Sequence, residues 1–207
     1  MMNKPNLREL KKEATAHALA EAAFQLTLER GLDGFVVEDV VQRAGYSRRT
    51  FANYFSCKEA AVAMAAHPYQ GVEEVFDLIH QMPDSTPPIE ALYQFVKMQL
   101  ATQSLRRMRQ LFELCKKHPT LEPYTLSVIH SLQKETQKLL TSMYQNTYST
   151  QYTYLLAGTI FATIIPMLDG TLRVLLPGDS AGDDPEAAPL EHFLETTFQY
   201  LRQGFQH

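Results

Sequence analysis

The chain contains no tryptophan and only two cysteines, Cys57 and Cys115, in 207 residues. These cysteines form no CxxC pair and no Cys/His ligand spacing, so neither a disulfide framework nor a metal site is indicated. The longest apolar run, residues 155–168, is too short to span a bilayer. The first residues carry acids among the lysines and no apolar stretch, so we expect no signal peptide. A cytoplasmic protein that uses no cofactor and stays off the membrane is therefore predicted.

The sequence also lacks an excess of positive charge, because 19 Lys and Arg stand against 23 Asp and Glu, a net charge of −4. This deficit is uneven along the chain. Residues 1–58 hold nine basic and seven acidic side chains, a net charge of +2, whereas residues 59–207 hold ten and sixteen, a net charge of −6. The charge distribution supports a local DNA footprint at the N-terminal end of an otherwise acidic protein.

Residues 35–58, FVVEDVVQRAGYSRRTFANYFSCK, carry a helix-turn-helix pattern. Two short segments with apolar residues at helical spacing, 37–44 and 48–55, are separated by the three residues GYS. Gly45 can end the first helix with a positive φ, and Ser47 can cap the second. This stretch is therefore predicted to form two short helices and no strand.

The second of these helices presents a face suited to DNA. Phe51 and Phe55, four residues apart, turn inward, which leaves outward the side chains of Arg48, Arg49, Ala52 and Asn53. Arg can donate to guanine O6 and N7, Asn can pair with adenine, and Ala can touch a thymine methyl group. Tyr54 and Lys58 flank this face, and from there they would reach phosphates, which position a protein without reading sequence.

The motif AGYSRRTFANYFSCKE resembles the DNA-binding signature of the TetR family of bacterial transcriptional regulators, over about residues 14–62. The resemblance implies an all-α protein with an N-terminal three-helix helix-turn-helix domain in residues 1–58 and a linking helix from about residue 58. Residues 59–207 would form a larger helical domain for effector binding and dimerisation. The DNA-facing positions that it implies are Ser47, Arg48, Arg49, Thr50, Ala52, Asn53, Tyr54 and Lys58.

Three positions depart from the family pattern. Val36 stands where a Thr usually caps the helix and touches a phosphate, Cys57 replaces a Ser, and Ala52 replaces a common aromatic residue. These changes are expected to alter which operator is read more than whether DNA is bound. The resemblance implies a repressor without enzymatic activity, which binds a palindromic double-stranded operator as a homodimer and is released by an unidentified small-molecule effector.

The remainder of the chain also favours helices, because few runs alternate as strands do and proline-rich breaks separate the apolar segments. The fold class expected is all-α. Helices are predicted at about residues 7–30, 37–44, 48–55, from 58, 69–81, 88–104, 105–117, 121–146, 150–175 and 189–204.

Two late segments carry apolar stripes that would form a four-helix bundle with a second copy of the chain. The predicted dimer contacts are Tyr154, Gly158, Ile165, Phe193, Thr197 and Tyr200. Burial within one subunit explains any one of these residues equally well. A ligand cavity between the helices has as candidate lining Phe95, Met98, Phe112, Cys115, Tyr124, Ile129, Leu156, Phe161 and Met167. Most of these are expected to belong to the ordinary core.

Two other functions have some support in the sequence. GDSAG around Ser180 matches the GxSxG motif of serine hydrolases, but that motif needs a strand before it and a helix directly after it, and a helix and an acidic loop are expected here. Cys57 is expected at a helix N-terminus beside Lys58. Both the positive end of the helix and the positive charge of Lys58 favour a reactive thiolate. Redox sensing through Cys57 is therefore an alternative, against its being an incidental Ser-like residue.

Overall fold

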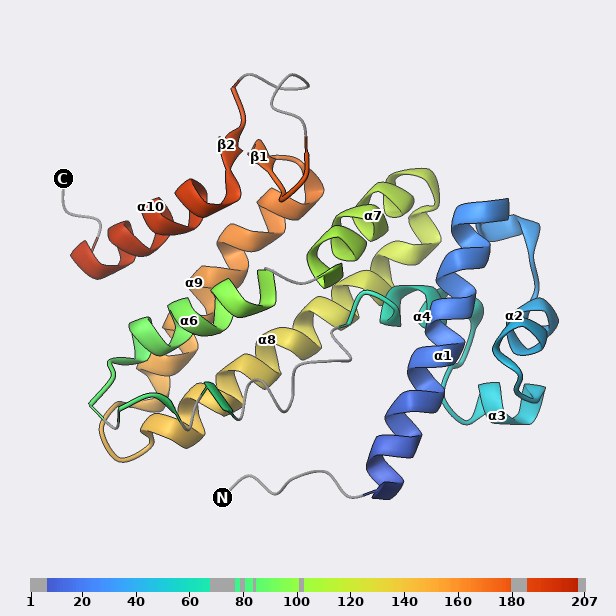
Figure 1. Ribbon diagram of the computed structural model, residues 1–207, viewed down its shortest axis with the longest axis horizontal. Helices are drawn as coiled ribbons and strands as arrows, with labels where there is room; N and C mark the ends of the chain where they lie inside the picture. Colours follow the sequence, from blue (N-terminus) through green and yellow to red (C-terminus); the bar gives the residue numbers. More distant parts are fainter. Residues whose placement is uncertain are drawn as a thin grey trace. The chain divides into compact units, whose positions relative to one another are not determined.

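The computed structural model describes residues 7–67, 77–78, 81–83, 85–100, 103–179 and 186–204 (Figure 1). The chain divides into two compact units, 1–69 with 111–128 and 70–110 with 129–207. Two long helices, α7 (Gln103–Lys117) and α8 (Glu122–Tyr144), contribute residues to both units. The all-α fold class is confirmed. A functional boundary near residue 58 stays a prediction.

The first unit is built on α1 (Leu7–Arg30). It continues through the 3-10 turn η1 (Leu32–Gly34), α2 (Val37–Ala44), α3 (Arg48–Ala52) and α4 (Lys58–Met64), and includes a second 3-10 turn, η2 (Pro119–Leu121). One face of α1 packs on α2 and α4 (Figure 1). Leu19, Phe24 and Leu26 of α1 are at most 1% exposed, and burial of such apolar side chains holds the short helices to the long one.

The second unit contains α6 (Pro88–Leu100), α9 (Thr150–Asp169) and α10 (Leu190–Gln203) with the adjoining parts of α7 and α8. Helix α6 contacts both α9 and α10. Two residues of β1 (Val174–Leu175) pair in parallel with two of β2 (Ala188–Pro189). Phe198 is fully buried, and its ring meets Tyr93 edge to face at 4.9 Å between centroids, which ties α10 to α6.

Three of the predicted helices end three or more residues earlier than expected. Helix α9 ends at Asp169 and not at residue 175, because Gly170 takes φ +86° and reverses the chain into β1. The recognition segment α3 ends at Ala52, with Asn53 as its C-cap. Helix α6 ends at Leu100, before residue 104. The helix expected at residues 69–81 falls mostly outside the described residues.

Helix α9 is apolar along most of its length. In the part of the chain that the structure describes, it alone is long and apolar enough to cross a bilayer by those two criteria, although core helices of soluble proteins meet them too. One side of it is core, since Ile160 and Met167 are at most 2% exposed. Another side is not, since Tyr154 is 57% and Leu155 69% exposed.

Candidate nucleic-acid interface

The turn between α2 and α3 has the predicted chemistry. Gly45 takes φ +75° and its N–H donates to the carbonyl oxygen of Val41, which ends α2. The Ser47 hydroxyl oxygen then accepts from the Thr50 N–H at 3.0 Å and lies 2.8 Å from the Thr50 hydroxyl. The first N–H groups of a helix have no partner within the helix. Because Ser47 supplies an acceptor for one of them, the turn sets where α3 begins.

Two phenylalanines fix the orientation of α3. Phe51 is 3% and Phe55 7% exposed, and their ring centroids lie 5.5 Å apart. Because these rings face the core, the opposite face of α3 is held outward. The side chains on that outer face are exposed: Arg48, Arg49, Ala52 and Asn53.

One nitrogen of the Arg48 guanidinium forms an ion pair within the protein. Its Nη1 lies 2.7 Å from Oε1 of Glu38 on α2, and both side chains are largely exposed, at 76% and 55%. The neighbouring acid has a different partner, because Asp39 Oδ2 accepts from the Val36 N–H at 2.9 Å. Asp39, in the first turn of α2, thus satisfies the N–H of the residue that precedes the helix.

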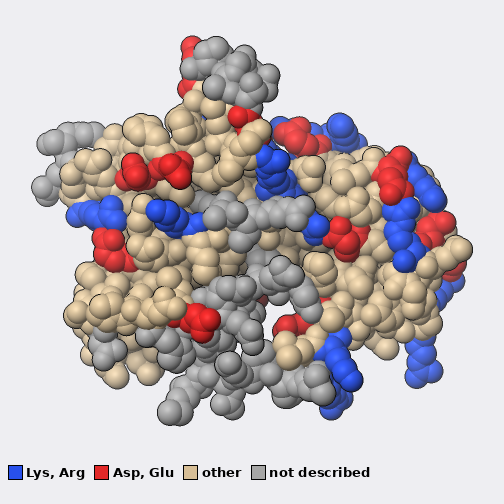
Figure 2. All heavy atoms as spheres, in the orientation of Figure 1, with Lys and Arg blue, Asp and Glu red and all other residues tan. Residues whose placement is uncertain are grey.

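A second exposed ion pair joins α1 to α2. The Arg43 guanidinium donates to both carboxylate oxygens of Glu29, at 2.8 and 2.6 Å. The hydrogen bond from Arg43 lowers the pKa of Glu29. On the face shown in Figure 2, basic and acidic side chains lie next to one another in several places. Arginine–carboxylate pairing of this kind reduces the non-specific attraction of a surface to phosphates.

Lys58, the first residue of α4, points into the first unit. Its Nζ donates to the carbonyl oxygens of Leu32 at 2.6 Å and Phe35 at 2.9 Å, and it lies 5.0 Å from the centre of the Phe35 ring. The side chain is therefore half-buried and bound to the turn that precedes α2. Tyr54 is half-buried as well, and its ring centroid lies 6.5 Å from that of Phe55.

The two thiols lie in the same unit and contact neighbouring residues of α8. The hydrogen bond to Cys57 raises the pKa of the Tyr124 phenol. Cys115 Sγ lies 3.2 Å from the Thr125 hydroxyl, and burial raises the pKa of the Cys115 thiol. Burial therefore keeps Cys115 in its unreactive protonated form, whereas Cys57 forms the N-cap of α4.

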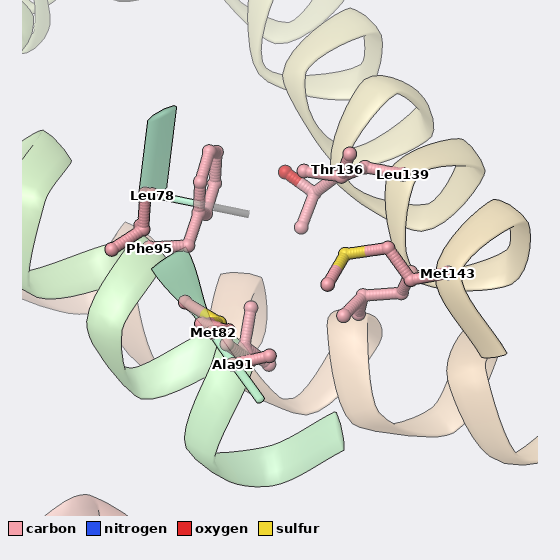
Figure 3. A pocket seen from close by; sticks show the side chains of 9 residues that line it. Leu78, Met82, Ala91, Phe95, Thr136, Leu139 and Met143 are labelled. Carbon is pink, nitrogen blue, oxygen red and sulfur yellow. The ribbon is translucent and has the colours of Figure 1, made fainter. Parts of the chain in front are cut away.

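An apolar cleft lies within the second unit, between α6 and α8 (Figure 3). Its volume is about 10 Å³, about the space of one water molecule, so a larger ligand would need α6 and α8 to move apart. Its lining is Leu78, Met82, Ala91, Leu92, Phe95, Thr136, Leu139, Leu140 and Met143. Thr136 is the one polar member, and its hydroxyl donates to the Leu132 carbonyl oxygen at 2.9 Å. A ligand of this cleft would have to be apolar.

Of the nine residues predicted to line a cavity, Phe95 lines this cleft. The other residues that line the cleft could not be predicted from the sequence. Methionine and leucine recur at the same helical spacing whether they line a cleft or fill a core. Ile129, Leu156 and Met167 are buried. The remaining predicted residues are half-buried and lie outside the lining of the cleft: Met98, Phe112, Cys115, Tyr124 and Phe161.

The predicted dimer residues divide by exposure. Tyr154 is 57% and Tyr200 41% exposed, whereas Gly158, Ile165, Phe193 and Thr197 are half-buried. Leu155, at 69%, is the most exposed large apolar side chain of the described residues, and it follows Tyr154 in the apolar stripe from which the dimer contacts were predicted.

Ser180 lies outside the described residues, so the hydrolase alternative has no geometry to support it. The residues just before it are held by α7: Arg109 Nη1 lies 3.1 Å from Asp179 Oδ2, and Arg106 donates to the Pro177 carbonyl oxygen. His192 is exposed on α10. Across the described ranges, no three His, Cys, Asp or Glu side chains are grouped as a metal site would need.

Residues 19–63 match the family described as bacterial regulatory proteins, tetR family. A solved structure of the fatty acid degradation regulator FadR from Bacillus halodurans is 21% identical, with a TM-score of 0.53, over 99% of this chain and 100% of that one. A transcriptional regulator from Rhodococcus sp. Rha1 is 21% identical, with a TM-score of 0.48, over 91% and 96% of the two chains. The FadR likeness shows a shared fold. No curated protein matches the sequence.

Proposed function

Because residues 19–63 place this chain in the TetR family, as a DNA-binding transcriptional regulator, we propose that it is a repressor that binds a palindromic operator as a homodimer and leaves it on binding an effector. The observation that carries the proposal is the outer face of α3, where Arg48, Arg49, Ala52 and Asn53 are exposed above two buried phenylalanines. Such a face fits the major groove, and its side chains match base edges there. A cytoplasmic location follows from this role.

Dimerisation is proposed from two features. A five-residue α3 can contact only a few base pairs, and a two-fold dimer doubles the site that is read. Helix α9 also exposes Tyr154 and Leu155 on an otherwise apolar helix, which a second copy would cover. A second copy on that face would bring a second α3 into the complex.

The effector is proposed to bind in the α6–α8 cleft. Because the lining carries no charged side chain and its one hydroxyl is bonded within α8, the ligand that this cleft would admit as its helices move apart is uncharged and apolar. The same helix α8 brings Tyr124 to the unit that holds the DNA-reading face. A ligand releases DNA only if it binds better to the non-binding conformation, so a shift of α8 is the change we expect it to favour.

The DNA proposal is tested by selecting bound sequences from a random duplex pool with the purified chain at physiological salt. An enriched inverted repeat supports a dimeric sequence reader, and a single half-site supports a monomeric one. Arg49→Ala should lose roughly 1 to 3 kcal/mol of discrimination at one position of the repeat. Bulk binding without enrichment, equal for this variant and the wild type, would contradict the proposal.

The effector proposal is tested with N-phenyl-1-naphthylamine, an uncharged apolar fluorophore. Saturable fluorescence that Met143→Gln weakens, with release of operator DNA at the same concentrations, supports it. Met64→Gln is the matched control, because Met64 is 38% exposed on α4 and lies outside the cleft lining. Equal weakening by both substitutions would count against the cleft.

A further inference from the structure

Glu38 on α2 is placed to orient Arg48, one of the two arginines of the DNA-reading face. Its Oε1 lies 2.7 Å from Arg48 Nη1, at the first residue of α3. The two acids in the first turn of α2 have separate partners, because Asp39 caps the helix through the Val36 N–H. Glu38 takes no part in that cap and is instead paired with Arg48 on α3.

Stability is a poor explanation of the pair itself. Arg48 and Glu38 are 76% and 55% exposed, and ion pairs between such side chains add little to folding because water and salt screen them. An exposed arginine, however, has many rotamers, and each contact it makes with DNA must pay for fixing one of them. A pair that restricts the guanidinium before binding removes part of that cost.

The geometry leaves the rest of the guanidinium available. Glu38 contacts Nη1, while arginine carries five N–H donors in a planar fork. Two of the remaining donors suffice for guanine O6 and N7. The Glu38 carboxylate also repels phosphates, which are the competing partners of an arginine on DNA. The pair therefore favours base contacts over backbone contacts.

We propose that Glu38 is a positioning residue for sequence discrimination, which orients Arg48 toward a base edge and away from phosphate. This inference rests on the proposed DNA-binding function. It assigns specificity to a residue on α2 that touches no base itself.

The test is a double-mutant cycle of Glu38→Gln and Arg48→Ala, with Kd measured for the selected operator and for its single-base-pair variants. At the base pair that Arg48→Ala identifies, Glu38→Gln should lower discrimination roughly three- to tenfold. Its affinity for random duplex should stay the same or rise. In the Arg48→Ala background, Glu38→Gln should change discrimination by less than about twofold.

Glu29→Gln is the matched control, since it breaks the exposed Arg43–Glu29 pair and removes one negative charge from the same unit. It should leave discrimination at that base pair as in the wild type. Unchanged discrimination in Glu38→Gln, or an equal loss without Arg48, overturns the inference while the DNA-binding function stands. A wild-type chain that prefers no sequence overturns the function, and the inference with it.

Discussion

The Lys58 ammonium group donates to the Phe35 carbonyl oxygen at 2.9 Å and lies 5.0 Å from the centre of the ring of the same residue. With its second bond, to the Leu32 carbonyl oxygen, Lys58 joins α4 to the turn between α1 and α2. A residue expected from the sequence to reach phosphate thus has two backbone partners inside its own unit. Substitution of Lys58 should lower the stability of the fold if Lys58 holds this turn, and should change the salt dependence of DNA binding if Lys58 contacts phosphate.

Lys58→Met should lower the free energy of unfolding by about 1 to 3 kcal/mol, because two carbonyls lose a charged donor. The salt dependence of DNA binding should hardly change. Urea unfolding and Kd at several salt concentrations provide the two readouts. Lys12→Met, an exposed lysine of α1, is the control and should keep the stability of the wild type. A direct phosphate contact would instead flatten the salt slope of Lys58→Met by about one unit and spare stability.

Leu155→Glu should break the proposed dimer. At 69% exposure in one subunit, the new charge costs little in a monomer, but it would be buried and unpaired against a second copy. Light scattering on the eluting protein should show a monomer, and affinity for the inverted repeat should fall more than affinity for a half-site. Leu126→Glu on α8, where Leu126 is 50% exposed, should remain dimeric. A Leu155→Glu dimer as tight as the wild type would rule out this face.

The local signals of the helix-turn-helix were sufficient to predict α2 and the turn that follows. Gly45 and Ser47 act within four residues of their own position, and helical spacing identified Phe51 and Phe55 as core. The partner of Lys58 could not be predicted in this way, since the Leu32 and Phe35 carbonyls are 26 and 23 residues away and come close only after α1 and α4 have packed. The end of α9 was missed because leucine and valine recur after Gly170, as far as Leu176.

Cys57 stays a hypothesis as a redox sensor, and its hydrogen bond with Tyr124 makes that hypothesis specific. Oxidation to a sulfenic acid would enlarge the group at the N-cap of α4 and disturb this contact. Hydrogen peroxide should then weaken operator binding by the wild type and by Cys115→Ser, but not by Cys57→Ser. Equal sensitivity of the two variants would remove Cys57 as the sensor and leave an incidental Ser-like residue.

Glu90 predicts an acid-sensitive contribution to the stability of the second unit. Arg202 donates to both of its carboxylate oxygens, at 2.6 and 2.9 Å, and this hydrogen bonding lowers the pKa of Glu90. Because the folded-state pKa lies below the unfolded one, the pair stabilises the fold above the ordinary glutamate pKa of about 4.5. That contribution is lost as the pH falls through the lowered value.

Melting temperatures of the wild type and Glu90→Gln over this range measure the effect. The wild type should melt higher at pH 7, and the gap should narrow below about pH 4.5 and close at lower pH. Glu186→Gln is the control, because Glu186 is 82% exposed and water screens its pair with Arg173, so its melting curve should follow the wild type throughout. A gap between the wild type and Glu90→Gln that persists at low pH would mean that packing of the side chain, and not its charge, stabilises the unit.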